Sequence, residues 1–257
     1  MSGKPQSVLV VDDDVDTCHN LRDILTDLGY RVDVAHDGPS ALELVRHKHY
    51  DVALLDYLMP GMDGVTAYRE IKKLRAGTVA IVVTAYASGA TAEEALQAGA
   101  WQVLPKPVDF PKLLGLVGEA LDQPLVLVVD DDPDLCAVLW DLLRERGYRV
   151  GVAHDEQAAA RQLGDKAFKV VLIDMKLPQG DGSGVFRKVR ESNPGARTVV
   201  ITAHRAEMDP VVRQVVAEGA DAVCYKPFDV PKLLNLLGEL VQRRGEAVGT
   251  DPGRGGS

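Results

Sequence analysis

Residues 8–14 read Val-Leu-Val-Val-Asp-Asp-Asp, and the same seven residues recur at positions 126–132. In both places an apolar, mostly β-branched run leads directly into acids, which is typical of a buried parallel strand that ends at a polar loop. A second stretch, Gly-Tyr-Arg-Val-Asp-Val-Ala-His-Asp at residues 29–37, returns at 147–155 with a single change. A long period that occurs only twice indicates two tandem domains rather than a solenoid.

The length of the chain agrees with this duplication, because 257 residues suffice for two domains of about 120 residues that each bury a core. The repeat predicts a first domain over residues 1–123 and a second over residues 124–244. The short connection between them, Asp122–Pro124, would restrict how the domains can be oriented. Residues 245–257 are rich in Gly and turn-forming residues, and we expect a disordered tail there.

Apolar runs and amphipathic stretches alternate along the first copy. The apolar runs are predicted to be strands: Val8–Val11, Val32–Val34, Val52–Leu55, Val79–Val83 and Gln102–Leu104. The amphipathic stretches are predicted to be helices: Asp16–Leu28, Pro39–Arg46, Val65–Leu74, Thr91–Ala98 and Phe110–Leu121. Right-handed crossovers then predict a doubly wound (βα)5 α/β fold in each copy. For its parallel five-stranded sheet we expect the order 2-1-3-4-5, because this is the order in known folds of the flavodoxin-like type.

Chemically active side chains follow the predicted strands of the first copy. Asp12 and Asp13 come after the first strand, and Asp56, Thr84 and Lys106 lie at the ends of the third, fourth and fifth. Because these strand ends meet at one edge of the sheet, the carboxylates would repel one another without a cation. Mg²⁺ prefers oxygen ligands, and a carboxylate nucleophile beside a metal ion and a lysine suits phosphoryl transfer.

The second copy repeats this set in the same order, with Asp130, Asp131, Asp174, Thr202 and Lys226. Each residue alone is ordinary, since an acidic run after a strand is most often a solvated loop and helix cap. Recurrence of the whole set at matching strand ends favours a functional site in both copies.

Four blocks of the first copy, V-L-V-V-D-D-D, A-L-L-D-Y-L-M-P-G-M-D-G, V-V-T-A-Y and L-P-K-P-V-D, resemble the signature blocks of the receiver domains of two-component signalling. The second copy resembles them with V-L-V-V-D-D-D, V-L-I-D-M-K-L-P-Q-G-D-G, V-I-T-A-H and Y-K-P-F-D. Together the two resemblances extend from Val8 to about Val241, which is nearly the whole chain.

The resemblance implies a role for each matching residue. It implies that Asp56 and Asp174 are the phosphoacceptors and that each domain binds one Mg²⁺. The remaining implied roles are metal ligands at Asp13 and Asp131 and at the backbone carbonyls of Leu58 and Lys176, metal-bound water at Asp12 and Asp130, switch hydroxyls at Thr84 and Thr202, and phosphoryl-binding cations at Lys106 and Lys226. It further implies cis peptide bonds at Lys106-Pro107 and Lys226-Pro227, which only X-Pro bonds adopt at low cost.

One position departs from the resemblance. Many receivers carry Tyr or Phe three residues before the lysine, whereas this chain has Val103 and Val223. Trp101 and Tyr225 lie nearby, and we interpret both as ordinary packing residues. The usual aromatic switch is therefore not expected in either domain.

We expect a phosphotransfer protein without an output domain that signals through protein contacts, because the residues outside the two receivers are too few to bind DNA or turn over a nucleotide. The resemblance implies that the phosphoryl groups come from a sensor histidine kinase or a histidine phosphotransfer protein. We expect no turnover of a separate substrate. One alternative is an adaptor in which a single receiver is phosphorylated and the other serves for docking or dimerisation. Another is a Mg²⁺-dependent aspartyl-phosphate phosphatase, but such enzymes place a second acid where Leu58 and Lys176 stand. The kinase, the downstream target, the oligomeric state and membership of a hybrid kinase stay open.

Charge and composition exclude other classes of partner. A net charge of −9 disfavours contact with nucleic acid and anionic lipid. No apolar run approaches the about 18 residues of a membrane span, and residues 1–7 lack the pattern of a signal peptide. The three cysteines, Cys18, Cys136 and Cys224, have no metal-site spacing. These features predict a cytoplasmic protein.

The residues that would overhang the two phosphoacceptors differ. The first copy has Leu58 and Tyr86 two positions after its aspartate and its threonine, and the second has Lys176 and His204. Apolar bulk hinders an attacking water, whereas polar groups can either position one or hold the phosphoryl oxygens. This predicts a longer-lived phosphate on Asp56 than on Asp174.

Overall fold

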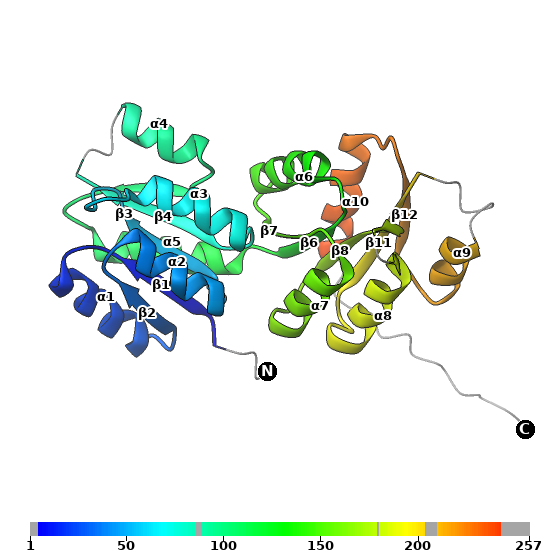
Figure 1. Cartoon of the computed structure of the whole chain (residues 1–257), viewed down its shortest axis with the longest axis horizontal. Helices are drawn as coiled ribbons and strands as arrows, with labels where there is room; N and C mark the ends of the chain where they lie inside the picture. The colour runs from blue at the N-terminus through cyan, green and yellow to red at the C-terminus, as the bar shows by residue number, and fades with distance from the viewer. Residues whose placement is uncertain (1–4, 86–88, 179, 204–209, 243–257) are drawn as a thin grey trace, which may run out of the picture. The chain divides into compact units, whose positions relative to one another are not determined.

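The computed structural model describes residues 5–85, 89–178, 180–203 and 210–242, and it contains two separate five-stranded parallel sheets (Figure 1). The first sheet has the order β2-β1-β3-β4-β5, as the sequence predicts. Its strands are β1 (Ser7–Val11), β2 (Arg31–Ala35), β3 (Val52–Asp56), β4 (Val79–Thr84) and β5 (Gln102–Pro105). Its helices are α1 (Val15–Asp27), α2 (Gly38–His47), α3 (Gly64–Leu74), α4 (Ala90–Gln97) and α5 (Phe110–Asp122).

The second sheet has the order β12-β11-β8-β6-β7, which is the same arrangement traced from the opposite edge. Its strands are β6 (Leu125–Val129), β7 (Arg149–Ala153), β8 (Val170–Asp174), β11 (Arg197–Thr202) and β12 (Ala222–Tyr225). Its helices are α6 (Pro133–Glu145), α7 (Glu156–Asp165), α8 (Gly182–Ser192), α9 (Pro210–Ala217) and α10 (Val230–Gln242). Both copies therefore have the doubly wound α/β fold.

A short antiparallel hairpin in the second copy was not expected from the sequence. It pairs β9 (Lys176–Leu177) with β10 (Gly180–Asp181), directly after β8. Two-residue strands carry too little periodicity to be recognised in a sequence. The hairpin gives the loop after Asp174 a regular hydrogen-bonded backbone.

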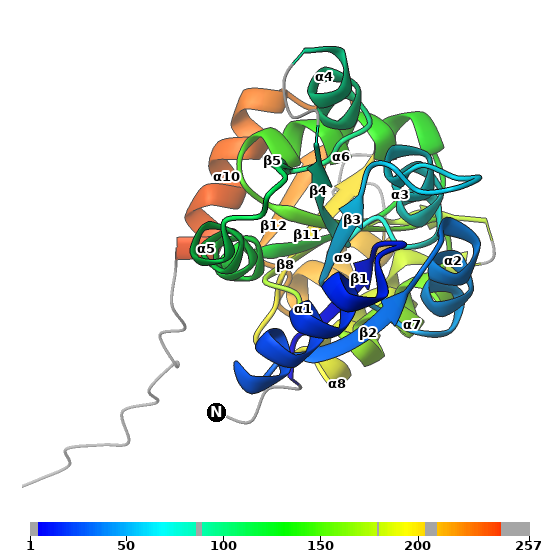
Figure 2. The same cartoon turned by 90° about the vertical axis from the view of Figure 1, so that its left-hand side faces the viewer.

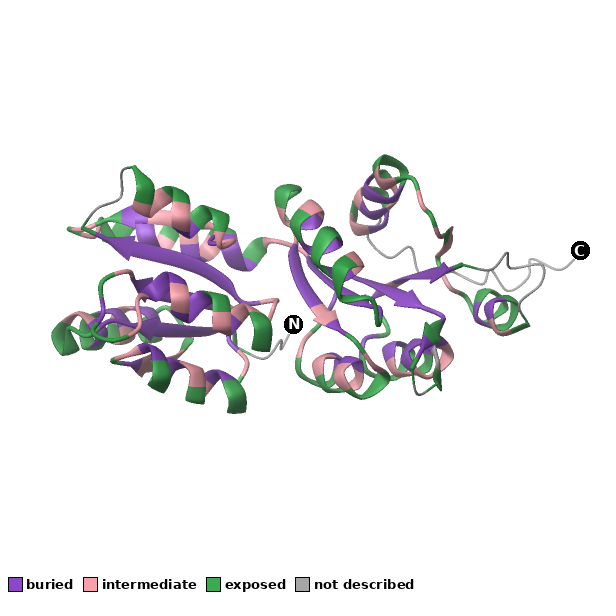
Figure 3. Ribbon diagram, turned by 45° about the horizontal axis from the view of Figure 1, so that its top comes forward, coloured by how far each residue is buried: buried purple, intermediate pink, exposed green. Residues whose placement is uncertain are grey.

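Helices cover both faces of the first sheet, and the alternation of side chains along the strands explains why. Leu9 and Val11 point into a core with α2 and α3, whereas Val8 and Val10 point into a second core with α1 and α5. Figure 2 shows these two helix pairs on opposite sides of the strands. All residues of β1, β3 and β4 are buried, as the purple strands in Figure 3 show. Burial on both faces accounts for their almost uniformly apolar sequences.

Aspartate side chains fix where several helices begin. Asp14, Asp37, Asp63 and Asp109 lie at the N-caps of α1, α2, α3 and α5. Each accepts a hydrogen bond from a backbone N–H in the first turn, which the helix itself cannot satisfy. Helices α1, α2 and α3 consequently start one residue earlier than the apolar periodicity predicts.

Helix α5 ends at Asp122 and β6 begins at Leu125, so few residues connect the two copies. The predicted boundaries at 123 and 244 stay predictions, and the predicted tail at 245–257 lies outside the described residues. Among the described helices, none combines the length and the apolar character that crossing a bilayer requires.

Candidate functional site

The structure brings three carboxylates together at the carboxyl edge of the first sheet. Asp12 and Asp13 follow β1, and Asp56 ends β3, the neighbouring strand. One oxygen from each lies within 4.8 Å of the others. Asp12 and Asp56 are buried, and Asp13 is exposed. The site therefore has two acids in the protein interior and one that opens to solvent.

The second copy builds the same cluster from Asp130, Asp131 and Asp174, again within 4.8 Å of one another. Asp130 is fully buried and Asp174 is 5% exposed, whereas Asp131 is exposed. The recurrence of both geometry and burial means that the two sites can carry out the same chemistry.

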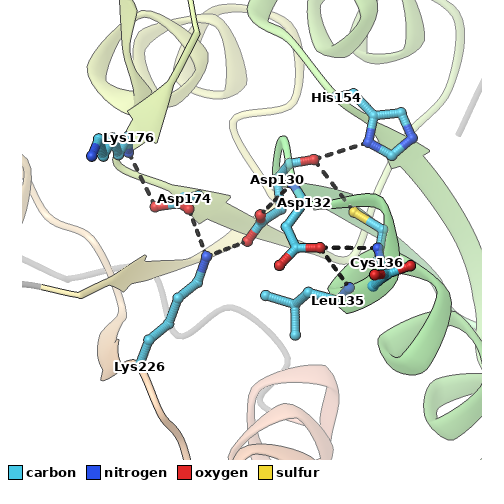
Figure 4. Close-up of polar contacts among 9 residues, drawn as sticks. Asp130, Asp132, Leu135, Cys136, His154, Asp174, Lys176 and Lys226 are labelled. Carbon is cyan, nitrogen blue, oxygen red and sulfur yellow. Dashed lines mark hydrogen bonds and ion pairs between the residues drawn. The ribbon is translucent and has the colours of Figure 1, made fainter.

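A lysine after the last strand of each sheet reaches two of these acids. Lys106 Nζ lies 3.0 Å from Asp12 Oδ2 and 3.0 Å from Asp56 Oδ2. In the second copy Lys226 Nζ lies 2.7 Å from Asp130 Oδ2 and 2.6 Å from Asp174 Oδ2. Figure 4 draws both contacts as dashed lines. Both lysines precede a proline, and both X-Pro bonds are cis as predicted. The lysine thus balances part of the negative charge at each site.

Burial and charge shift the ionisation of these groups. Burial raises the pKa of Asp56, and the nearby charge of Asp12 raises it further, while Lys106 acts in the opposite direction. Burial opposes the ammonium of Lys106, but hydrogen bonds and charge from Asp56 and Asp12 outweigh it and raise the pKa of Lys106. Burial likewise raises the pKa of Asp130 despite Lys226. With three carboxylates and one lysine, each site also carries a net negative charge, which favours a bound cation.

The third acid of each Asp-Asp-Asp run has a different function. Asp14 accepts a hydrogen bond from the N–H of Thr17 and caps α1. Asp132 accepts hydrogen bonds from the N–H groups of Asp134 and Leu135. The helix-cap interpretation of the acidic run thus applies to its last residue, and the first two acids remain with the cluster.

The threonines end β4 and β11, the strands next to β3 and β8. Thr84 and Thr202 are both buried. Their main-chain carbonyls accept hydrogen bonds from the N–H groups of Lys106 and Lys226, each at 2.8 Å. This backbone contact couples the threonine to the lysine in both copies.

The residues two positions after Asp56 and Asp174 differ between the copies. Leu58 is 51% exposed. Lys176 is also exposed, and its N–H donates to Asp174 Oδ1 at 3.1 Å. The proposed metal-binding carbonyls of both residues stay predictions. Tyr86 and His204 lie outside the described residues.

The positions that lack the usual aromatic residue are only half-buried. Val103 packs against the core shared with α2 and α3, and Trp101 packs against the core shared with α1 and α5. Tyr225 is 42% exposed. The contacts of Trp101 agree with its interpretation as a packing residue.

Two glycines of the site were missed in the sequence. A Cβ atom built on Gly64 would lie 2.2 Å from the backbone oxygen of Asp56, and one on Gly182 would lie 2.5 Å from that of Asp174. Each glycine follows an aspartate in the matching blocks M-D-G and G-D-G, so the repeat itself was the available signal. Each lies in the first turn of a helix, α3 or α8, that approaches the backbone of Asp56 or Asp174 closely.

We expect Gly64→Ala to destabilise the first domain by about 1–3 kcal/mol, because the new methyl group must displace the backbone of Asp56. Gly118→Ala is the matched control, since a Cβ at Gly118 in helix α5 meets nothing within 4 Å. Alanine in a helix interior is the better residue by about 0.5–1 kcal/mol. Chemical unfolding of both variants measures the difference, and equal stabilities would contradict the close approach.

The donor set fits a hard divalent cation. All three side chains of each cluster offer oxygen, no described histidine or cysteine belongs to either cluster, and one acid opens to solvent. Mg²⁺ is usually held by one or two carboxylates together with water and phosphate oxygens. The residues present therefore suit Mg²⁺ better than zinc or copper.

Comparison with known proteins agrees with this geometry. The family model described as the response regulator receiver domain matches residues 8–117 and 126–238. A response regulator receiver protein of Anaeromyxobacter sp. strain Fw109-5 is 35% identical over 240 residues, which are 93% of this chain and 97% of the relative. The transcriptional regulatory protein ZraR of Klebsiella oxytoca is 46% identical over 121 residues, which are 47% of this chain and 27% of that relative.

A response regulator receiver domain protein, CheY-like, from Methanospirillum hungatei is 34% identical and covers 46% of this chain and 95% of that chain, with a TM-score of 0.45.

Proposed function

Because the chain belongs to the response regulator receiver family and carries two such domains in tandem, we propose that it accepts phosphoryl groups on Asp56 and Asp174 from a phosphohistidine donor. The observation that carries this proposal is the buried carboxylate at the end of β3 and of β8, paired in each domain with a lysine and two further acids. Incubation with a small phosphodonor and Mg²⁺, followed by mass spectrometry of the modified residues, tests it.

The reaction forms one bond and breaks one. An oxygen of the aspartate carboxylate attacks phosphorus, and the bond between phosphorus and the donor nitrogen breaks with its electron pair leaving on the imidazole of the donor. Lys106 and Lys226 bind the developing negative charge on the phosphoryl oxygens, as their positions beside Asp56 and Asp174 allow. The buried threonine hydroxyls then meet a phosphoryl oxygen and report the modified state.

Receiver domains generally bind Mg²⁺ through such acids, and we propose one ion in each domain, held by Asp13 and Asp56 and by Asp131 and Asp174. When bound, the ion supplies positive charge to the equatorial oxygens of the transferred group. The described residues provide the oxygen donors for it at both sites.

The output is proposed to be a change in protein contacts, without turnover of a separate substrate. Val103 and Val223 replace the aromatic residue that many receivers use, so the threonine acts on a smaller side chain here. A histidine kinase or a histidine phosphotransfer protein is the proposed donor. Labelling of only one aspartate would instead favour the adaptor, in which the second domain serves for docking.

We expect the phosphate on Asp56 to outlive the phosphate on Asp174. Leu58 offers apolar bulk beside the first site, and Lys176 offers a polar side chain beside the second; both are exposed. Leu58 should hinder the attack of water on the first phosphate, and Lys176 should help the attack on the second. Decay is measured on Asp174→Asn and Asp56→Asn chains, and exchange of Leu58 and Tyr86 for Lys and His should shorten the lifetime on Asp56. Lifetimes that agree within about twofold would contradict this asymmetry.

A further inference from the structure

The main-chain carbonyl between the two clustered acids of each domain accepts hydrogen bonds from two side chains. Asp12 O accepts from the Sγ of Cys18 at 3.2 Å and lies 3.3 Å from Nδ1 of His36. Asp130 O accepts from the Sγ of Cys136 at 3.4 Å and lies 3.0 Å from Nδ1 of His154. Figure 4 draws both contacts in the second domain. The arrangement is therefore built twice from matching residues.

The direction of these hydrogen bonds follows from their chemistry. A carbonyl oxygen can only accept, so Nδ1 of His36 and of His154 must carry the proton. Burial raises the pKa of Cys18 to about 11 and that of Cys136 to about 12, so both thiols remain S–H donors near neutral pH. All four side chains are thus donors in the folded chain.

This carbonyl belongs to the peptide unit that joins the two acids. Because a peptide unit is planar, fixing the oxygen of Asp12 also fixes the nitrogen at which Asp13 begins. At the other end, the N–H of Asp12 donates to the carbonyl of Ala35 at 3.3 Å, directly before His36. In the second domain the N–H of Asp130 donates to Ala153 at 3.1 Å. The first acid of each pair is therefore held through both its N–H and its C=O.

We propose that His36 and His154 are positioning residues for the cation sites: by donating from Nδ1 to the carbonyl between the paired acids, each holds its repelling carboxylates in the arrangement that binds Mg²⁺. The histidine touches the main chain and not the reacting atoms, so its effect is on the affinity for the ion. A site whose ligands are already held in place loses less conformational entropy when the ion binds, so its affinity for the ion is higher. This inference rests on the proposed function.

The histidines are also the better residues to change. His36 and His154 are exposed, whereas Cys18 and Cys136 are buried in the core. Substitution of a cysteine would combine loss of the hydrogen bond with loss of packing. Asparagine in place of histidine retains an N–H donor near the position of Nδ1, and leucine retains bulk without a donor.

The test is a Mg²⁺ titration of the full ¹⁵N-labelled chain, followed through the backbone amides of Asp13 and Asp131. The unchanged domain is an internal control in the same sample. We expect His36→Leu to raise the Mg²⁺ Kd of the first domain by about three- to tenfold, as loss of one hydrogen bond implies, and His36→Asn to restore it to within about twofold. The second domain should keep its Kd. In the same way, His154→Leu should raise the Mg²⁺ Kd of the second domain and His154→Asn should restore it, while the first domain keeps its Kd.

Two results would overturn the proposal. One is an unchanged Kd in His36→Leu, and the other is an affinity in His36→Asn as weak as in His36→Leu, since the ring and not its N–H would then matter. If the unsubstituted chain binds Mg²⁺ and is labelled on Asp56 while either of these two results is found, only this inference fails and the proposed function stands. Absence of Mg²⁺ binding in the unsubstituted chain would overturn it together with the proposed function.

Discussion

Incubation of the chain with Mg²⁺ and acetyl phosphate is expected to label Asp56 and Asp174, and the Asp56→Asn/Asp174→Asn chain is expected to lose essentially all of this label. An amide is a far poorer nucleophile than a carboxylate, so each substitution removes the acceptor while it keeps the shape of the side chain. Each single variant should retain the label on the other aspartate, because each site has its own acids and lysine. Intact-mass measurement and peptide mapping count and place the label.

The loss of label must not come from unfolding. Burial raises the pKa of Asp56, so the folded chain binds its proton more tightly than the unfolded chain does. The free energy of unfolding therefore falls as the pH rises from the unfolded pKa of this acid to its folded pKa. A neutral amide does not ionise, so it causes no such fall. In metal-free buffer at neutral pH, Asp56→Asn should therefore be at least as stable as the unsubstituted chain. A lower thermal midpoint of Asp56→Asn would contradict this expected stability. Label that persists at the normal rate in the double variant would contradict the assignment of Asp56 and Asp174 as the acceptors.

Removal of Mg²⁺ is the second change with a large expected effect. Beryllofluoride is an anion that mimics the phosphoryl group, and each cluster presents three carboxylates within 4.8 Å of one another with one lysine beside them. Without a divalent cation these acids repel the anion, and the binding should weaken by more than about a hundredfold, since charges at such distances interact with energies of about 4 kcal/mol. Fluorine NMR of the chain with Mg²⁺ and with a chelator measures the difference.

Neighbouring acids supply the matched control for this prediction. In an Asp174→Asn background, Asp13→Asn should abolish Mg²⁺-dependent binding at the first site, because it removes an exposed acid of the cluster. Asp14→Asn removes the same charge one residue later but leaves a good cap for α1. It should retain the binding. Equal losses in both variants would mean that net charge, and not the cluster, controls the affinity.

Agreement between expectation and structure is closest where the signal is local. The predicted strand Val52–Leu55 becomes Val52–Asp56, and the predicted helix Phe110–Leu121 becomes Phe110–Asp122. Strand and helix periods extend over a few residues, so they can be recognised without any knowledge of the fold. The hairpin of Lys176–Leu177 with Gly180–Asp181 was missed because a strand of two residues is too short to show a periodic pattern.

In the candidate site, too, some residues were found from the sequence and others were missed. Its acids and lysines were found because they end strands and recur in both copies. The close approach of Gly64 to Asp56 was not found, although the glycine recurs as Gly182. A repeated glycine reveals that a backbone constraint exists, but the atom that imposes the constraint is seen only when helix and strand are packed together.

By itself, the sequence determined that this protein is a tandem duplication of one doubly wound domain, and it determined which acids, threonines and lysines end the strands, since repeats, periodicity and motifs are written along the chain. Only the tertiary structure decided which atoms meet. It placed Lys226 against Asp130 and Asp174, and it brought His154 to the carbonyl of Asp130. These contacts join residues far apart in the chain, and their distances depend on how strands and helices pack, which no local pattern encodes.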